Sequence, residues 1–200
     1  MKGSILIVAF FMVGSLCGAF HLFPLYITNS HISYYVLCAL MFSVGISIGN
    51  NPQSLRDFRA LNPRLALLPV MTIIGTLAGS LVVSLFLTHL SLTDCLAVGS
   101  GFGYYSLSSI FITEYKGAEL GTIALLSNIS REIITLLFAP LLVRWFGNLA
   151  PISAGGATTM DTTLPVITRY AGPPFVVVSI FHGMVIDFSV PFLVTFFCSI

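Results

Sequence analysis

The stretch Gly99-Ser-Gly-Phe-Gly-Tyr-Tyr-Ser-Leu-Ser-Ser109 decides the fold of this chain, and it lies within a charge-free run from Cys95 to Thr113. Glycine and serine fill seven of its eleven positions, and a glycine inside a helix costs about 1 kcal/mol relative to alanine. Irregular backbone is not tolerated against lipid, so such a segment in a membrane must be buried in protein or line a wet cavity. We therefore expect a broken or re-entrant segment around a polar site.

The composition places the chain in a membrane. Of 200 residues, 56% are hydrophobic and 8% are charged, whereas soluble domains carry about 25% charged residues. The net charge is +1 without a basic cluster, so no nucleic-acid partner is expected. The four cysteines have no C-x-x-C spacing, which favours buried thiols over disulfides or metal ligands; they are Cys17, Cys38, Cys95 and Cys198. We predict an all-α polytopic membrane protein in the lipid bilayer, one transmembrane domain over residues 1–200, without metal or cofactor.

Five apolar runs are long enough to cross the ~30 Å hydrocarbon core, at about residues 3–23, 32–48, 65–87, 120–143 and 175–200. Two further segments, about 95–112 and 153–167, are broken by glycine, serine and threonine. They are either re-entrant, which gives five spans, or full crossings, which gives seven membrane segments. The arginines of loop 50–64 place that loop in the cytoplasm. The re-entrant count gives the cleaner charge bias, with the N-terminus inside and the C-terminus outside.

Glycines four residues apart occur on each of the first three spans, at Gly14/Gly18, Gly45/Gly49 and Gly75/Gly79. Such pairs let helix backbones approach closely. We expect them to pack these spans together, with contact between copies of the chain as the alternative.

The ionisable residues within the apolar segments are the candidate functional groups, because a charge at a helix centre costs about 2.5–3.5 kcal/mol. Asn128 and Glu132 are four residues apart and share a helix face. Arg131 points about 100° away from Glu132, so we expect it to pair with another anion, with Asp161 as the candidate. The alternative is a purely structural bridge. Asp187 is a candidate proton carrier or, equally, a structural carboxylate, and His182 is expected to be a core histidine.

Asp161 lies in a threonine-rich segment after Gly155-Gly156, which indicates an unwound tip; a plain loop is the alternative. Transporter sites are often built from such half-helices at the membrane midplane. The candidate substrate- and proton-binding residues are Glu132, Asp161, Arg131, Asn128, Ser130, Tyr105, Ser106, Ser108, Ser109, Thr158 and Thr159.

These motifs resemble the bacterial lysine exporter family LysO over most of the chain. The resemblance rests on Gly101–Ser109 through Thr113-Glu114, on Asn128 with Ser130-Arg131-Glu132, on Gly156–Pro165, and on His182-Gly183 with Val190-Pro191. It implies a multi-pass inner-membrane protein that exports L-lysine and requires intramembrane acidic residues, one of which falls on Glu132. It also implies further N-terminal spans with a second acidic residue, so we expect a separately encoded N-terminal membrane partner, with a truncated paralogue of altered activity as the alternative.

The sequence thus predicts a secondary transporter that exports L-lysine, and close cationic analogues, in exchange for protons. Glu132 and Asp161 would bind the ammonium groups, and backbone N–H groups and hydroxyls of the broken segments would bind the carboxylate. Exporting a cation against the membrane potential costs about 2.3 kcal/mol per 100 mV, and an incoming proton cancels this cost. A non-transporting or regulatory subunit is the alternative. An intramembrane enzyme using Ser106 or Ser108 with His182 is disfavoured because no G-x-S-x-G or H-E-x-x-H motif is present. Homo-oligomer formation stays open.

Overall fold

In the computed structural model, residues 13, 16, 17, 63–87 and 89–200 are described. The chain divides into two compact units, Met1–Val44 and Gly45–Ile200. Apart from residues 13, 16 and 17, the expected spans 3–23 and 32–48 lie outside the described residues, together with their glycine pairs. The described residues form helices and no strand.

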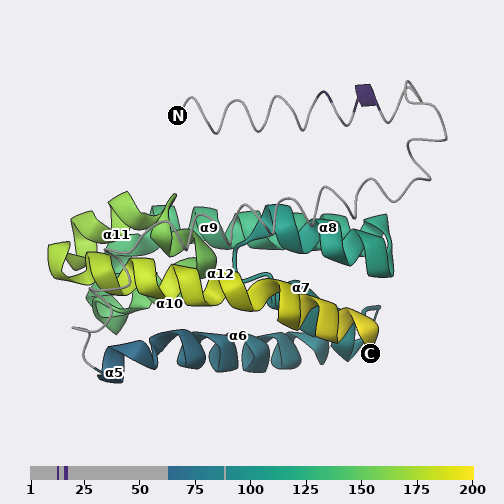
Figure 1. Ribbon diagram of the computed structural model, residues 1–200, viewed down its shortest axis with the longest axis horizontal. Helices are drawn as coiled ribbons and strands as arrows, with labels where there is room; N and C mark the ends of the chain where they lie inside the picture. The colour runs from purple at the N-terminus through teal and green to yellow at the C-terminus, as the bar shows by residue number, and fades with distance from the viewer. Residues whose placement is uncertain (1–12, 14–15, 18–62, 88) are drawn as a thin grey trace. The chain divides into compact units, whose positions relative to one another are not determined.

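Three long helices form the frame of the second unit (Figure 1). The short helix α5 (Pro63–Ala66) leads into α6 (Leu68–Ser84), followed later by α9 (Ala118–Phe146) and by α12 (Val176–Ser199), which the 3₁₀ turn η2 (Pro173–Phe175) precedes. Among the described residues, two continuous helices, α9 and Pro173–Ser199, are long and apolar enough to cross a membrane. The expected spans 120–143 and 175–200 therefore correspond to helices of the structure.

The long helices expose apolar side chains and bury polar ones, which suits a lipid surrounding. Asn128, His182 and Asp187 are each at most 3% exposed. In contrast, many large apolar side chains of the same helices lie on the surface, among them Ile134, Leu137, Phe138, Phe188, Phe192 and Phe196. In water such a surface would be a large apolar patch of the kind that marks a membrane or protein contact.

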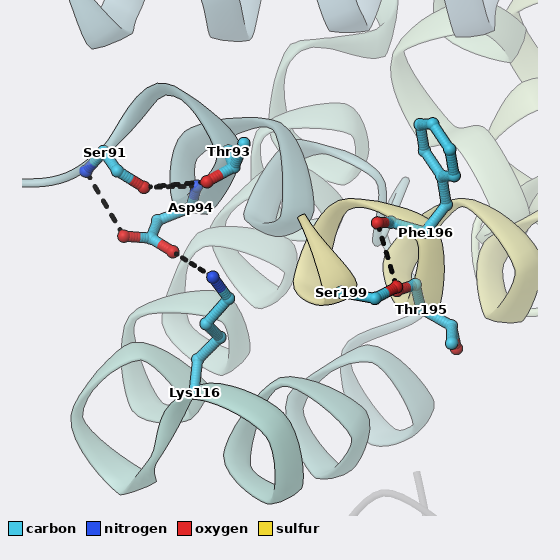
Figure 2. A network of polar contacts seen from close by, with 7 residues as sticks. All are labelled: Ser91, Thr93, Asp94, Lys116, Thr195, Phe196 and Ser199. Carbon is cyan, nitrogen blue, oxygen red and sulfur yellow. Dashed lines mark hydrogen bonds and ion pairs between the residues drawn. The ribbon is translucent and has the colours of Figure 1, made fainter.

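The segment expected at 95–112 forms a helical hairpin whose two ends lie together. Helix α7 (Leu92–Gly99) leads inward, residues 100–104 turn, and α8 (Tyr105–Lys116) returns. Figure 2 shows how the ends are joined: Lys116 Nζ lies 3.5 Å from Asp94 Oδ1, and Asp94 also caps α7 through a reciprocal capping box with Ser91. Gly117, with φ +95°, then turns the chain into α9.

The segment expected at 153–167 forms a second hairpin, which returns to the opposite end of the frame (Figure 1). It consists of α10 (Ala150–Gly155), the 3₁₀ turn η1 (Gly156–Met160) and α11 (Leu164–Ala171). Its open end is held by a buried apolar cluster of Ile152, Ile167, Ala171 and Val178, against which Val143 at the end of α9 packs. Because α10 and α11 join the same cluster, the hairpin enters and leaves at one end.

Helix α12 runs alongside both hairpins and packs against α7, α8 and η1. The closest approach is at Gly183, where an added Cβ atom would lie 2.8 Å from the backbone nitrogen of Met160. Gly75 and Gly79 differ: a Cβ atom added at either glycine of α6 would have no atom within 4 Å among the described residues. Their expected packing partners are the two spans outside the described residues.

Candidate functional site

The two hairpin tips touch each other near the middle of the frame. The backbone N–H of Ala157 in η1 donates to the carbonyl oxygen of Phe102 in the first tip, with an N···O distance of 2.9 Å. Gly156 has φ +64°, and a Cβ atom there would lie 2.1 Å from the same oxygen. Phe102 itself has φ +44°, which is unusual for a residue with a side chain. The contact therefore requires glycine at position 156.

Asn128 fixes the first tip to α9. Its Oδ1 atom accepts a hydrogen bond from the Gly103 N–H at 2.7 Å, and its Nδ2 donates to the Ala124 carbonyl at 2.9 Å. A Cβ atom on Gly101 would lie 2.4 Å from Asn128 Nδ2, so this glycine makes room for the amide. The buried Ser108 hydroxyl donates to the Tyr104 carbonyl at 2.8 Å. These two predicted site residues thus hold the shape of the tip.

Arg131 holds the second hairpin, and the prediction that it pairs with an anion such as Asp161 was wrong. Its Nε donates to the Ala154 carbonyl at 2.7 Å and its Nη2 to the Ser153 carbonyl at 3.0 Å. These carbonyls lie at the end of α10, where the last carbonyl groups of a helix have no N–H donor within the helix. The guanidinium also lies 5.8 Å from the centre of the Phe102 ring. Within residues 63–87 and 89–200 the ion pair found is Asp94–Lys116.

The hydroxyls of Thr158 and Thr159 are used within the second tip. Thr158 Oγ1 donates to the Gly155 carbonyl at 2.9 Å. Thr159 Oγ1 lies 2.8 Å from the Gly156 carbonyl oxygen and 2.9 Å from that of Ser179 on α12. These bonds replace the regular helical pattern that is lost where α10 gives way to η1, and they tie the tip to α12.

His182 is a core histidine, as predicted. It is fully buried, with Nδ1 3.3 Å from Thr159 Oγ1 and Nε2 2.9 Å from Thr72 Oγ1. Its ring therefore bridges η1 and α6 and contacts threonines rather than Ser106 or Ser108. This arrangement gives no support to a serine nucleophile activated by His182. The described His, Cys, Asp and Glu side chains form no group that could hold a metal ion.

Two carboxyl groups beside the tips form no ion pair with a described residue. Glu132 is half-buried on α9, and Asp161 is exposed directly after η1. Both exert an electrostatic effect on Tyr105 at the start of α8, and we refer to these three side chains together as the acidic locality. Asp161 Oδ1 accepts a hydrogen bond from the Thr162 N–H, whereas no hydrogen bond or ion pair joins Glu132 to another described residue. The acidic groups are thus available to a ligand.

The start of α8 supplies free donors in the same locality. In helix α8 the Ser108 N–H bonds to the Tyr104 carbonyl, while the N–H groups of Ser106 and Leu107 have no partner among the described residues. The first N–H groups of a helix carry a partial positive charge and bind anions. The Ser106 side chain is exposed beside them. The sequence predicted backbone N–H donors in the broken segments without naming positions; the structure identifies those of Ser106 and Leu107, at a helix that begins directly after a glycine-rich turn.

The other predicted residues lie less centrally. Ser109 is half-buried and Ser130 is exposed, and neither hydroxyl has a hydrogen-bond partner among the described residues. A separate cavity of about 420 Å³ lies between α6, α7 and α9 and is bordered by Thr76, Ser127, Asn128 and Arg131, but not by Glu132 or Asp161. The cavity and the acidic locality are therefore distinct features of the same fold.

A family model and two known proteins that resemble this chain all carry the name lysine exporter. The family model "Lysine exporter LysO" matches residues 8–198. The lysine exporter LysO of Escherichia coli is 38% identical over 82% of this chain and 54% of its own length, so this chain spans about half of that relative. The putative lysine exporter of Haemophilus influenzae is 36% identical over 94% of this chain and 92% of its own length. No solved structure matches the chain. The chain therefore belongs to the lysine exporter LysO family.

Proposed function

We propose that this chain is a secondary transporter that exports L-lysine, and close cationic analogues, across the inner membrane in exchange for protons. The observation that carries the proposal is the contact of two oppositely directed hairpin tips, Phe102 O to Ala157 N, beside the open carboxyl groups of Glu132 and Asp161. Broken segments that meet between long helices are a recurrent way to build a transporter site. Membership of the lysine exporter family supports lysine as the substrate.

The hairpin geometry supports the topology with five spans and two re-entrant segments. Arg144 lies near the end of α9 and Arg169 near the end of α11, at the end of the frame where the second hairpin opens. Lys116 lies at the opposite end and is paired with Asp94. If the arginine-rich end faces the cytoplasm, positive charge follows the positive-inside rule. The N-terminus is then inside and the C-terminus outside.

The site offers complementary groups for each charged part of lysine. The carboxylates of Glu132 and Asp161 would bind the two ammonium groups, and the free N–H groups at the start of α8, with the Ser106 hydroxyl, would bind the carboxylate. Such charge-assisted hydrogen bonds are stronger than neutral ones.

Lysine exchange in vesicles tests this proposal. Purified protein is reconstituted into liposomes loaded with unlabelled lysine, and entry of labelled lysine is measured. Glu132→Gln should reduce exchange at least tenfold, because the amide cannot replace the carboxylate charge. Glu119→Gln, an exposed acidic residue in the first turn of the same helix, should retain exchange within about twofold. Normal exchange by Glu132→Gln would rule out the proposed role of Glu132.

The second candidate function is a membrane subunit that needs a separately encoded N-terminal partner. The chain matches 54% of the E. coli relative and 92% of the H. influenzae relative. Vesicles that hold this chain alone should exchange lysine if the chain is sufficient. Exchange that appears only after co-reconstitution with the product of a neighbouring membrane reading frame would establish the partner-dependent form.

A further inference from the structure

Asp187 is a buried carboxyl group that the proposed lysine site does not use. It lies in the middle of α12, is 3% exposed, and its Oδ2 atom is enclosed without a hydrogen-bond partner among the described residues. Buried polar groups nearly always have partners. Among the described residues, the Oδ2 atom of an ionised Asp187 would have neither a donor nor a counter-ion, which is a strongly unfavourable state.

The backbone adds a second acceptor at the same position. Pro191 follows Asp187 by four residues inside α12. Proline has no N–H, so the Asp187 carbonyl oxygen lacks the helical donor that would normally come from position 191. Side-chain and main-chain acceptors thus occur together at one point of a helix buried against α7 and η1.

The helices packed against α12 carry charges of both signs, among them Glu114 and Lys116 on α8 and Arg169 on α11, but none of these acts on Asp187. Asp161, after η1, acts on it electrostatically, and Asp187 in turn acts on Tyr104 between α7 and α8. His182 on the same helix is held by two threonines. Asp94 of α7 and Lys116 of α8 act instead on Cys198 near the far end of α12.

We propose that Asp187, rather than a residue that binds lysine, binds the proton that is exchanged for lysine. A proton needs a single acceptor oxygen, and its binding converts the unpaired carboxylate into a neutral acid that tolerates the apolar interior. This inference rests on the proposed function, because it assigns the ion site of the same transporter. In this assignment α12 carries the proton-binding residue and α9 carries Glu132 of the lysine site.

Two modes of transport separate the proton site from the lysine site. Lysine–lysine exchange requires the lysine site alone, whereas accumulation of lysine driven by a pH gradient requires both. In proteoliposomes, Asp187→Asn should keep exchange within about twofold of the unmodified protein. Its pH-driven lysine accumulation, and the lysine-dependent proton flux reported by an internal pH dye, should fall at least tenfold. Ser189→Ala, on the same helix, should keep both modes.

The possible failures are distinguishable. Retained pH-driven accumulation in Asp187→Asn would overturn the assignment of the proton site. Loss of both modes in Asp187→Asn would also overturn it, because Asp187 would then belong to the lysine site or to the scaffold. Absence of lysine exchange in the unmodified protein, or normal exchange in Glu132→Gln, would instead refute the proposed function.

A chemical test on the unmodified protein does not depend on the folding of a variant. Dicyclohexylcarbodiimide modifies protonated carboxyl groups in apolar surroundings. At pH 7 we expect mass spectrometry to find the adduct on the peptide that contains Asp187 and not on the peptide that contains Asp94, which is paired with Lys116. Failure to modify Asp187 would contradict its protonated state.

Discussion

Replacing Gly156 with alanine tests the contact between the hairpin tips. Gly156 has φ +64° and ψ −126°, and holding a non-glycine residue in a region of this kind costs about 1–3 kcal/mol. The new Cβ atom would lie 2.1 Å from the Phe102 carbonyl oxygen, so the tips must separate. Separation breaks the hydrogen bond from Ala157 to that oxygen, and leaving a buried polar group unpaired costs about 1–3 kcal/mol more.

Gly117→Ala is the matched control. Gly117 also has a positive φ, of +95°, but a Cβ atom there would meet no described atom within 4 Å. Gly117→Ala introduces backbone strain without breaking a contact, whereas Gly156→Ala does both. Gly156→Ala should therefore be the more destabilising of the two variants by about 1–3 kcal/mol. Unfolding by sodium dodecyl sulfate in mixed micelles, followed by circular dichroism, measures the difference. Gly156→Ala should also reduce lysine exchange at least tenfold. Equal stability of the two variants would refute the tip-to-tip contact.

Four further substitutions test the scaffold and the hairpin ends. Asn128→Leu should destabilise the protein by about 1–3 kcal/mol in the same titration, because it leaves the buried Gly103 N–H without an acceptor. Arg131→Met should cost about 2–4 kcal/mol by removing its bonds to the end of α10, whereas Asp161→Asn should leave unfolding unchanged; equal losses would restore the Arg131–Asp161 pair. Partial burial acts to raise the pKa of Asp94, but the hydrogen bonds of Ser91 and the charge of Lys116 outweigh it and lower the pKa below its usual value. The stabilisation by Asp94 is therefore present above the usual aspartate pKa and is lost as the pH falls through the lower pKa of the folded state. Asp94→Asn should lower the free energy of unfolding at pH 7 by at most about 1 kcal/mol and should have no effect near pH 2.

The broken segments were predictable because their residue types are unsuited to continuous helices. Gly101 and Gly103 lie in the first turn, where Asn128 and the second tip leave no room for side chains. Gly156 adopts a conformation that other residues rarely adopt. Steric demands of this kind appear directly in the sequence as glycine, so the positions of both breaks could be inferred without coordinates.

The partners of Arg131 could not be predicted in the same way. The sequence shows a buried cation and several acids, and pairing them is the simplest expectation. In the structure Arg131 instead donates to the backbone carbonyls of Ser153 and Ala154. Every residue has a backbone carbonyl, so no sequence pattern identifies the ones that bind Arg131. N–H donors in the broken segments could be predicted, but the positions of the free N–H groups at the start of α8 could not, for the same reason. Main-chain groups become visible as ligands only when the ends of helices are placed.

Substrate protection at the start of α8 tests most directly that the locality beside the tips binds lysine. Ser106→Cys is made in a chain whose four cysteines are replaced by alanine, and its labelling by a water-soluble maleimide is timed in proteoliposomes. Lysine should slow labelling at least threefold, because its carboxylate would cover the exposed position 106. Labelling of Thr122→Cys, which is exposed in the first turns of α9, should not change. Lysine-independent labelling of position 106 in protein that still exchanges lysine would contradict the proposed site.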